Sequence, residues 1–258
     1  MPDSLTHKEL LQQDLGALEK SDINDLYHWV GTFRSQSADY GDGFSATLTA
    51  EEMYQLNRSL LTIEEMLEHK VAKHFLKGNP ESLARYLSLT SVAYYTAEAD
   101  YLSQYGDQLC FIGSGAIPHS AIVYYEKQKL RTLLIEQNQQ ASELSKAVLI
   151  KYYGKKIVNR YFDFCVCPGE NWQESNSDYH LGVIAGHCSN KKALLNNLFK
   201  QMPRGSRILQ RRPKGLYQVA YEEVNLNSES GYDILQDGKV IGCSNILKTP
   251  QIYQKKDR

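Results

Sequence analysis

One short stretch of the sequence combines two glycines, a serine and a following helix in a pattern suited to ligand binding. The strand-like run Leu109–Gly113 leads into Gly113-Ser114-Gly115, and a helical segment, Ser120–Gln128, follows. Glycines let the backbone turn sharply and come close to a ligand, while a helix N-terminus favours its polar groups. The third glycine of a dinucleotide fingerprint is missing, because Ala116 and Ile117 follow. The loop therefore indicates either a nucleotide-type site other than a standard NAD site, or an ordinary strand–helix turn.

A carboxylate at the end of the next strand favours the first of these readings. Leu130–Glu136 has the composition of a buried strand, and Glu136 lies 21 residues after Gly115. A carboxylate in that place can accept hydrogen bonds from both ribose hydroxyls of an adenosine. The alternative is a solvated glutamate at a strand end. Taken together, the glycine loop and Glu136 predict a bound adenosyl ligand.

The first part of the chain, which must pack beside this loop, has helical periodicity. Thr49 followed by Glu52 is a capping-box pattern, and apolar residues then recur every three or four positions as far as Lys77. A further helix is expected from Glu81 to Tyr105. We therefore predict a helical N-terminal domain over residues 1–106.

The second part alternates short apolar runs with helical stretches, which is typical of a buried, mostly parallel sheet. Asp237-Gly238 between two strand-like runs predicts an antiparallel hairpin. A parallel sheet closed by such a hairpin is the outline of the class I methyltransferase fold, so we expect a Rossmann-like α/β domain over residues 107–258. The strand-like runs are Leu109–Gly113, Leu130–Glu136, Ile157–Val166, His180–Gly186, Arg207–Gln210, Tyr232–Gln236 and Lys239–Cys243, and the helical runs between them are Ser120–Gln128, Ser142–Tyr153 and Lys191–Lys200.

Charge and hydropathy exclude two classes of partner. The chain of 258 residues has a formal net charge of −1 and no basic run or stripe, so nucleic acid is not an expected partner. No apolar run approaches the length of a membrane span, and the start of the sequence lacks the pattern of a secretory signal. We expect a cytoplasmic protein with no membrane partner.

The cysteines do not indicate disulfides or a metal. Their number, five, is odd, which does not suit a disulfide framework. Cys165 and Cys167, taken with His187 and Cys188, contain the residue types of a zinc site. They lack the paired spacings of structural zinc sites, and small buried core residues are the simpler interpretation. We expect no metal.

The glycine loop and its surroundings resemble one family of enzymes. Phe111–Pro118, with the sequence FIGSGAIP, resembles the Phe-Ile/Val-Gly-Ser-Gly-Pro-Leu-Pro motif of nicotianamine synthases. It also resembles the Gly-Ser-Gly-Ala-x-Pro segment of the bacterial opine-metallophore synthases of the staphylopine and pseudopaline type. Glu64–Gly78 is similar to the helix before the fold in those enzymes, and Arg211-x-x-x-Gly215-Leu216, followed by Tyr221, is similar to their stretch after the fifth strand. The short, compact chain is closer to the bacterial branch.

The resemblance implies an unusual use of S-adenosylmethionine. These enzymes transfer its aminocarboxypropyl arm, rather than its methyl group, onto an amino nitrogen and release methylthioadenosine. In the bacterial branch the acceptor is typically a single histidine, and the product belongs to opine-type metallophore biosynthesis. S-adenosylmethionine is then a co-substrate, no metal is required, and the partner is a small amino acid. A homodimer stays an open alternative.

The resemblance also assigns catalytic roles. Glu68 matches the family's catalytic glutamate, because its spacing to Gly78 is right. Glu64 lies one turn earlier on the same helix face and is the second candidate. Tyr86 lies where the family has the first tyrosine of its Phe-Pro-Tyr-x-x-Asn-Tyr element, most of which this sequence lacks. A carboxylate beside the donor can hold the acceptor amine and take its proton. A surface charge on an amphipathic helix is the alternative for either glutamate.

Two other functions use the same features. A small-molecule methyltransferase shares the fold and the co-substrate but would release S-adenosylhomocysteine, and a non-catalytic binding protein could use the same scaffold. Arg211 suits a clamp for a substrate carboxylate, and it suits a structural role equally well. The predicted donor site comprises Gly113, Ser114, Gly115, Pro118, Glu136, Asp163 and Gly186, and the predicted acceptor site comprises Arg211 and His187.

Overall fold

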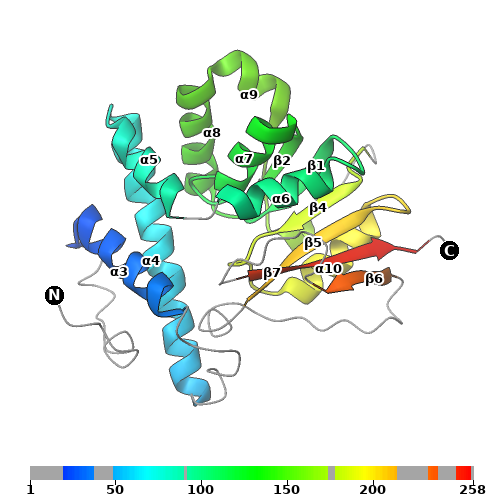
Figure 1. Ribbon diagram of the computed structural model, residues 1–258, viewed down its shortest axis with the longest axis horizontal. Helices are drawn as coiled ribbons and strands as arrows, with labels where there is room; N and C mark the ends of the chain where they lie inside the picture. Colours follow the sequence, from blue (N-terminus) through cyan, green and yellow to red (C-terminus); the bar gives the residue numbers. More distant parts are fainter. Residues whose placement is uncertain are drawn as a thin grey trace.

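The computed structural model describes residues 20–37, 49–89, 92–173, 178–213, 232–237 and 248–256. Within these residues a seven-stranded sheet has the order β3-β2-β1-β4-β5-β7-β6 (Figure 1). The strands from β3 to β5 pair in parallel, and β7 pairs antiparallel with both β5 and β6. The predicted methyltransferase-like sheet is therefore confirmed. The strands are β1 Gln108–Ile112, β2 Arg131–Glu136, β3 Phe162–Val166, β4 Leu181–Ile184, β5 Arg207–Pro213, β6 Tyr232–Asp237 and β7 Lys248–Lys255.

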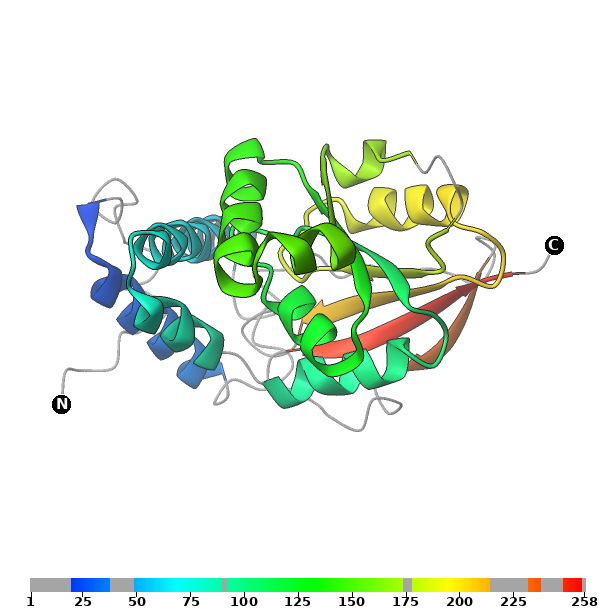
Figure 2. The same ribbon diagram turned by 90° about the horizontal axis from the view of Figure 1, so that it is seen from above.

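Helices cover both faces of this sheet. Figure 2 shows α6 and α7 on one face and α10 on the other. The first face carries a core of tyrosines and aliphatic side chains, including Tyr94, Tyr124 and Leu134, and the second packs Leu194, Leu195 and their neighbours against the strands. The helices are α3 Ile23–Ser37, α4 Ala50–Leu76, α5 Pro80–Ser88, α6 Val92–Leu102, α7 His119–Gln128, α8 Gln139–Tyr153, α9 Lys155–Tyr161, the 3-10 helix η2 Gly169–Asn171 and α10 Lys191–Gln201.

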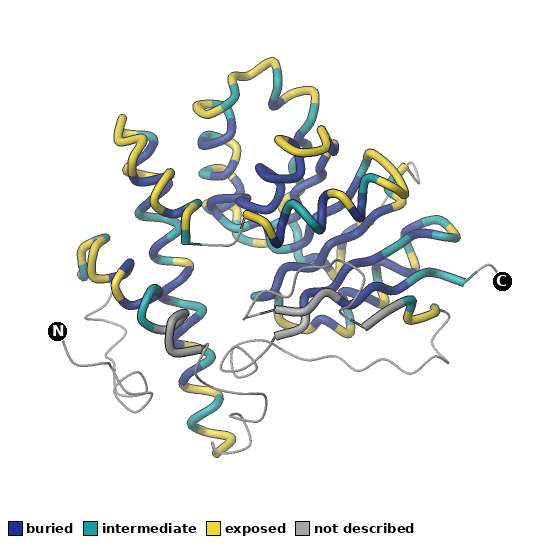
Figure 3. Tube along the Cα trace, viewed as in Figure 1, coloured by how far each residue is buried: buried dark blue, intermediate teal, exposed yellow. Residues whose placement is uncertain are grey.

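The long helix α4 joins the N-terminal segment to the sheet. It begins at the predicted capping box: the Thr49 hydroxyl accepts from the Glu52 N–H, and the Glu52 carboxylate accepts from the Thr49 N–H. One apolar cluster contains Ile63 and Leu67 of α4 together with Ile117 and Val148 of the second half. In Figure 3 the inner turns of α4 and the strands are buried, while the outer turns of the helices are exposed. The apolar face of α4 therefore packs against the loop after β1 and against α8.

Several element boundaries differ from the prediction. Residues 157–161 form the end of α9 instead of the start of a strand, because a short apolar run is compatible with either element. The helix expected from Glu81 to Tyr105 is two helices: α5 packs on α4, whereas α6 packs on α7. The second hairpin strand, predicted at 239–243, lies outside the described residues, and the described partner of β6 is β7.

The division into domains at residue 106 stays a prediction. No helix in the described ranges has the length and hydropathy needed to cross a membrane.

Candidate active site

A cavity of about 440 Å³ lies between the middle of α4 and the carboxyl ends of four parallel strands. The neighbours of β1 are β2 and β4, so the chain order reverses here, and open α/β sheets bind ligands at such a switch point. The lining residues come from α4 and from the segments that follow β1, β2, β3 and β4: Leu61, Glu64, Glu65, Glu68, Ile112, Gly113, Ser114, Gly115, Ala116, Ile135, Glu136, Gln137, Asn138, Cys167, Gly169, Glu170, His187, Cys188, Ser189 and Leu194.

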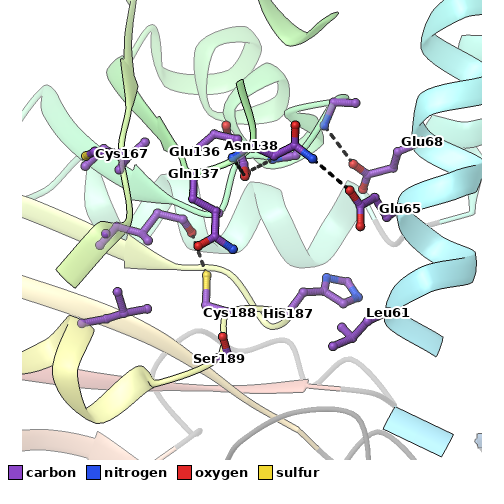
Figure 4. A pocket seen from close by; sticks show the side chains of 18 of the residues that line it. Leu61, Glu65, Glu68, Glu136, Gln137, Asn138, Cys167, His187, Cys188 and Ser189 are labelled. Atoms are coloured by element: carbon purple, nitrogen blue, oxygen red, sulfur yellow. Dashed lines mark hydrogen bonds between the residues drawn. The ribbon is translucent and has the colours of Figure 1, made fainter. Parts of the chain in front are cut away.

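Three glutamates on α4 each contact the loop after a different strand, and Figure 4 shows the contacts of two of them, Glu65 and Glu68. Residues three and four apart share a helix face, and this spacing turns Glu64, Glu65 and Glu68 toward the sheet. The Ala116 N–H after β1 donates to Glu68 Oε2 at 3.1 Å. The Asn138 side-chain amide after β2 donates to Glu65 Oε1 at 3.1 Å. The imidazole of His187, after β4, pairs with the Glu64 carboxylate.

The surroundings of Glu68 disfavour the charged form of its carboxyl group. Burial raises its pKa from 4.5 to about 7. The hydroxyl of Tyr86, which donates to Glu68 Oε1 at 2.7 Å, opposes the rise in pKa, and the negative charge of Glu64 adds to it. A carboxyl group whose pKa lies near neutrality can both accept and release a proton under working conditions. Glu68 is therefore suited to acid–base chemistry.

Two features of the loop after β1 require glycine at positions 113 and 115. One is the backbone conformation, and the other is the closeness of neighbouring side chains. Gly113 and Gly115 have φ values of +79° and +66°, in the left-handed region that favours glycine. A Cβ at Gly113 would collide with Cys188 Sγ, and one at Gly115 would collide with Glu68 Oε2. The loop can therefore approach both the segment after β4 and the α4 carboxylate.

Glu136 is held at the carboxyl end of β2 by two backbone groups. The Gly115 N–H donates to Oε2 at 2.9 Å and the Asn138 N–H donates to Oε1 at 3.0 Å. A carboxylate has about four acceptor positions, so Glu136 can accept further hydrogen bonds from a ligand in the cavity. Its predicted contact with a ribose stays a prediction.

Asp163 does not lie at this cavity. The structure starts β3 at Phe162, so Asp163 is the second residue of the strand, far from its carboxyl end, and its carboxylate pairs with Arg131 at 2.9 Å. The predicted run, Ile157–Val166, has the same carboxyl end as β3, so the position of Asp163 in the strand gave no reason to expect it at the cavity, and its assignment to the donor site is not supported. Pro118, the N-cap of α7, and Gly186, after β4, are also not among the lining residues.

Arg211 is part of a buried network instead of the cavity lining. Its guanidinium donates to both oxygens of Glu98, at 2.9 and 2.6 Å, and to the hydroxyls of Ser120 and Tyr124, both at 2.9 Å. The predicted strand ended at Gln210, but β5 continues to Pro213 because β7 pairs along it. The Arg211 side chain therefore points into the core, and the structural alternative is the correct one.

The lining also contains residues that were not among the predicted site residues. Glu65 follows the predicted catalytic residue Glu64. It lies four residues after Leu61, a spacing that places both side chains on one helix face. Most of the polar ones lie in segments that follow a strand, where lining residues of α/β sheets are concentrated. These segments contribute Gln137 and Asn138 after β2, Cys167, Gly169 and Glu170 after β3, and Cys188 and Ser189 after β4.

Strand order and the position of the cavity define a Rossmann-like protein of the class I methyltransferase type. Residues 56–241 match the family described as "Nicotianamine synthase protein", and the chain belongs to the nicotianamine synthase family. It is thus placed among S-adenosylmethionine-dependent transferases. A search of curated proteins gave no match.

Solved structures agree in fold across nearly the whole chain. A glutamate-to-glutamine variant of MtNAS in complex with S-adenosylmethionine has a TM-score of 0.71 at 15% identity, covering 96% of each chain. MtNAS in complex with MTA and tNA has a TM-score of 0.73 at 14% identity, covering 97% of each chain. At these identities the likeness establishes a shared fold.

Proposed function

We propose that the protein transfers the aminocarboxypropyl arm of S-adenosylmethionine onto the amino group of an amino acid and releases methylthioadenosine. The observation that carries this proposal is Glu68, a partly buried carboxyl group with a pKa near 7 that contacts the glycine loop. Membership of the nicotianamine synthase family supports the same reaction. The solved relative that binds S-adenosylmethionine supports the choice of donor.

In the proposed reaction the donor's adenosine lies against the glycine loop, with its ribose hydroxyls on Glu136. The free amine of the acceptor attacks the γ-carbon of the arm. The bond between that carbon and sulfur breaks, and its electron pair neutralises the sulfonium. The proton lost by the new ammonium goes to Glu68. Because the sulfonium is already a good leaving group, positioning supplies most of the acceleration.

Tyr86 has a positioning role in this proposal. Its hydroxyl donates to Glu68 Oε1, while the Ala116 N–H donates to Oε2, so the carboxylate is fixed in orientation. A carboxylate retains acceptor positions beyond these two bonds. The acceptor amine can therefore donate to Glu68 without displacing either partner.

The finer assignments rest on the resemblance to the bacterial branch. We propose histidine as the acceptor, a cytoplasmic reaction that needs no metal, and a product of the opine-type metallophore class. Within the described ranges no three His, Cys, Asp or Glu side chains converge as metal ligands.

Product analysis tests the proposed function directly. The purified protein would be incubated with S-adenosylmethionine and a panel of amino acids, and the products identified by mass spectrometry. Methylthioadenosine together with an acceptor heavier by one aminocarboxypropyl group is the expected result. S-adenosylhomocysteine with a methylated acceptor would establish the methyltransferase alternative instead.

A further inference from the structure

The cavity carries a strong excess of negative charge. The described lining residues include five glutamates and one histidine but no lysine or arginine: Glu64, Glu65, Glu68, Glu136, Glu170 and His187. S-adenosylmethionine brings one net positive charge, because its sulfonium and ammonium outweigh its carboxylate. An ordinary amino acid acceptor is a zwitterion and brings none. Since like charges in a confined site repel, a cationic acceptor fits this lining better than a neutral one.

Glu64 shows which carboxylate would receive the additional positive charge. It is buried, with 8% of its surface exposed, whereas Glu65 is exposed and hydrogen-bonded to Asn138. A nitrogen base already contacts Glu64, namely the imidazole of His187. This imidazole belongs to the turn after β4, and 36% of its side-chain surface is exposed to solvent.

The helix sets the distance between the two carboxylates. Glu64 and Glu68 are separated by one turn, which places their Cβ atoms about 5–6 Å apart. If the α-amino group of the acceptor lies at Glu68, a second nitrogen must lie about one turn away to reach Glu64. The side chains of histidine and of short diamino acids carry a basic nitrogen at about this separation.

We propose that Glu64 determines acceptor specificity by binding a basic nitrogen in a short acceptor side chain, and that the His187 imidazole occupies this position until the acceptor displaces it. The inference rests on the proposed arm transfer and identifies its substrate class. It separates the two helix carboxylates by role: Glu68 serves the nucleophilic nitrogen and Glu64 the side-chain nitrogen.

Paired acceptors of equal shape test the inference. Norvaline is the uncharged isostere of 2,4-diaminobutyrate, and 3-(2-thienyl)alanine is that of histidine. The value of kcat/KM would be measured for all four with the native protein, Glu64→Gln and Glu143→Gln. The last is a matched control, because Glu143 is an exposed carboxylate of α8 that pairs with Gln139.

We expect the native protein to prefer each basic acceptor over its isostere, and Glu64→Gln to reduce that preference about 10- to 100-fold, as expected for a lost charge-assisted hydrogen bond. Glu143→Gln should leave the preference unchanged. A Glu64→Gln variant that slows both members of each pair equally, or a native protein without the preference, overturns the inference. If other amino acids of the panel yield methylthioadenosine but none of these four does, the inference fails while the proposed arm transfer stands; if no amino acid of the panel yields it, the arm transfer itself fails.

A second variant tests the part assigned to His187. In His187→Ala the imidazole no longer competes with the acceptor's side-chain nitrogen for Glu64. The KM for 2,4-diaminobutyrate should therefore fall about two- to tenfold. A KM that rises instead would show that His187 helps to bind the acceptor, and the displacement would be wrong.

Discussion

Two glutamates of this protein, Glu98 and Glu68, each accept a hydrogen bond from a tyrosine hydroxyl, yet their surroundings differ in charge. Glu98 accepts from Tyr124 at 2.5 Å and is also paired through both oxygens with Arg211. Glu68 accepts from Tyr86 at 2.7 Å, but its closest ionisable neighbour on α4 is another carboxylate, Glu64. One cluster is balanced in charge and the other is not.

The balance decides what each cluster can do. Although burial opposes the charge on Arg211, Glu98 holds the pKa of that guanidinium well above its usual value, so the guanidinium stays charged. Burial and the neighbouring carboxylate raise the pKa of Glu68 to about 7. Perturbed groups in a cavity are candidates for chemistry, whereas fully paired buried ions are structural.

The sharpest test of this contrast is Glu68→Gln. The amide keeps the shape of the side chain but cannot accept a proton, so turnover should fall about 10²–10⁴-fold. Binding of S-adenosylmethionine should persist, because the glycine loop and Glu136 are unchanged. Steady-state rates of methylthioadenosine release and calorimetric titration would measure the two effects. Undiminished turnover would show that Glu68 is not the base.

Breaking the balanced cluster should affect stability instead. Arg211→Met leaves Glu98 buried without its charged partner and should lower the free energy of unfolding by about 3–5 kcal/mol. Urea denaturation would measure it, and adding Glu98→Gln to that variant should restore part of the loss. If Arg211→Met alone is as stable as the native protein, the ion pair contributes little to the free energy of unfolding.

The raised pKa of Glu68 predicts a pH dependence of stability. Because the folded protein binds this proton more tightly than the unfolded chain, the stabilisation is complete below about pH 4.5 and is lost as the pH rises through about 7. Between about pH 5 and pH 8 the native protein should lose on the order of 2–3 kcal/mol relative to Glu68→Gln. Parallel pH profiles of unfolding for the two proteins would contradict the raised pKa.

The smallest expected effect concerns the donor site. Glu136→Ala removes the carboxylate proposed to hold the ribose and should weaken binding of S-adenosylmethionine by about 1–3 kcal/mol. Asp163→Ala is the matched control, since Asp163 pairs with Arg131 away from the cavity, and its affinity should equal that of the native protein. If calorimetry shows that Asp163→Ala weakens binding of S-adenosylmethionine more than Glu136→Ala does, Asp163 and not Glu136 contributes to the donor site.

The sequence was most informative where local chemistry determines the structure. The capping box at Thr49 and the strand–loop–helix around Gly113 both depend on neighbouring residues, and both are present. The site was harder to predict because it depends on strand ends. Asp163 was assigned to the donor site but is the second residue of β3, and Arg211 was assigned beyond a strand that in fact includes it. Pairing with β7, distant in sequence, sets that boundary.

The three carboxylate contacts of α4 restrict which changes in chain length this helix can tolerate. Successive residues of a helix are turned by about 100° and rise about 1.5 Å, so one residue inserted between Leu61 and Glu68 would rotate Glu68 away from the glycine loop. Added or deleted residues before Leu56 would leave every lining side chain in place. Length variation among related sequences should therefore concentrate at the start of α4 and be absent from its middle.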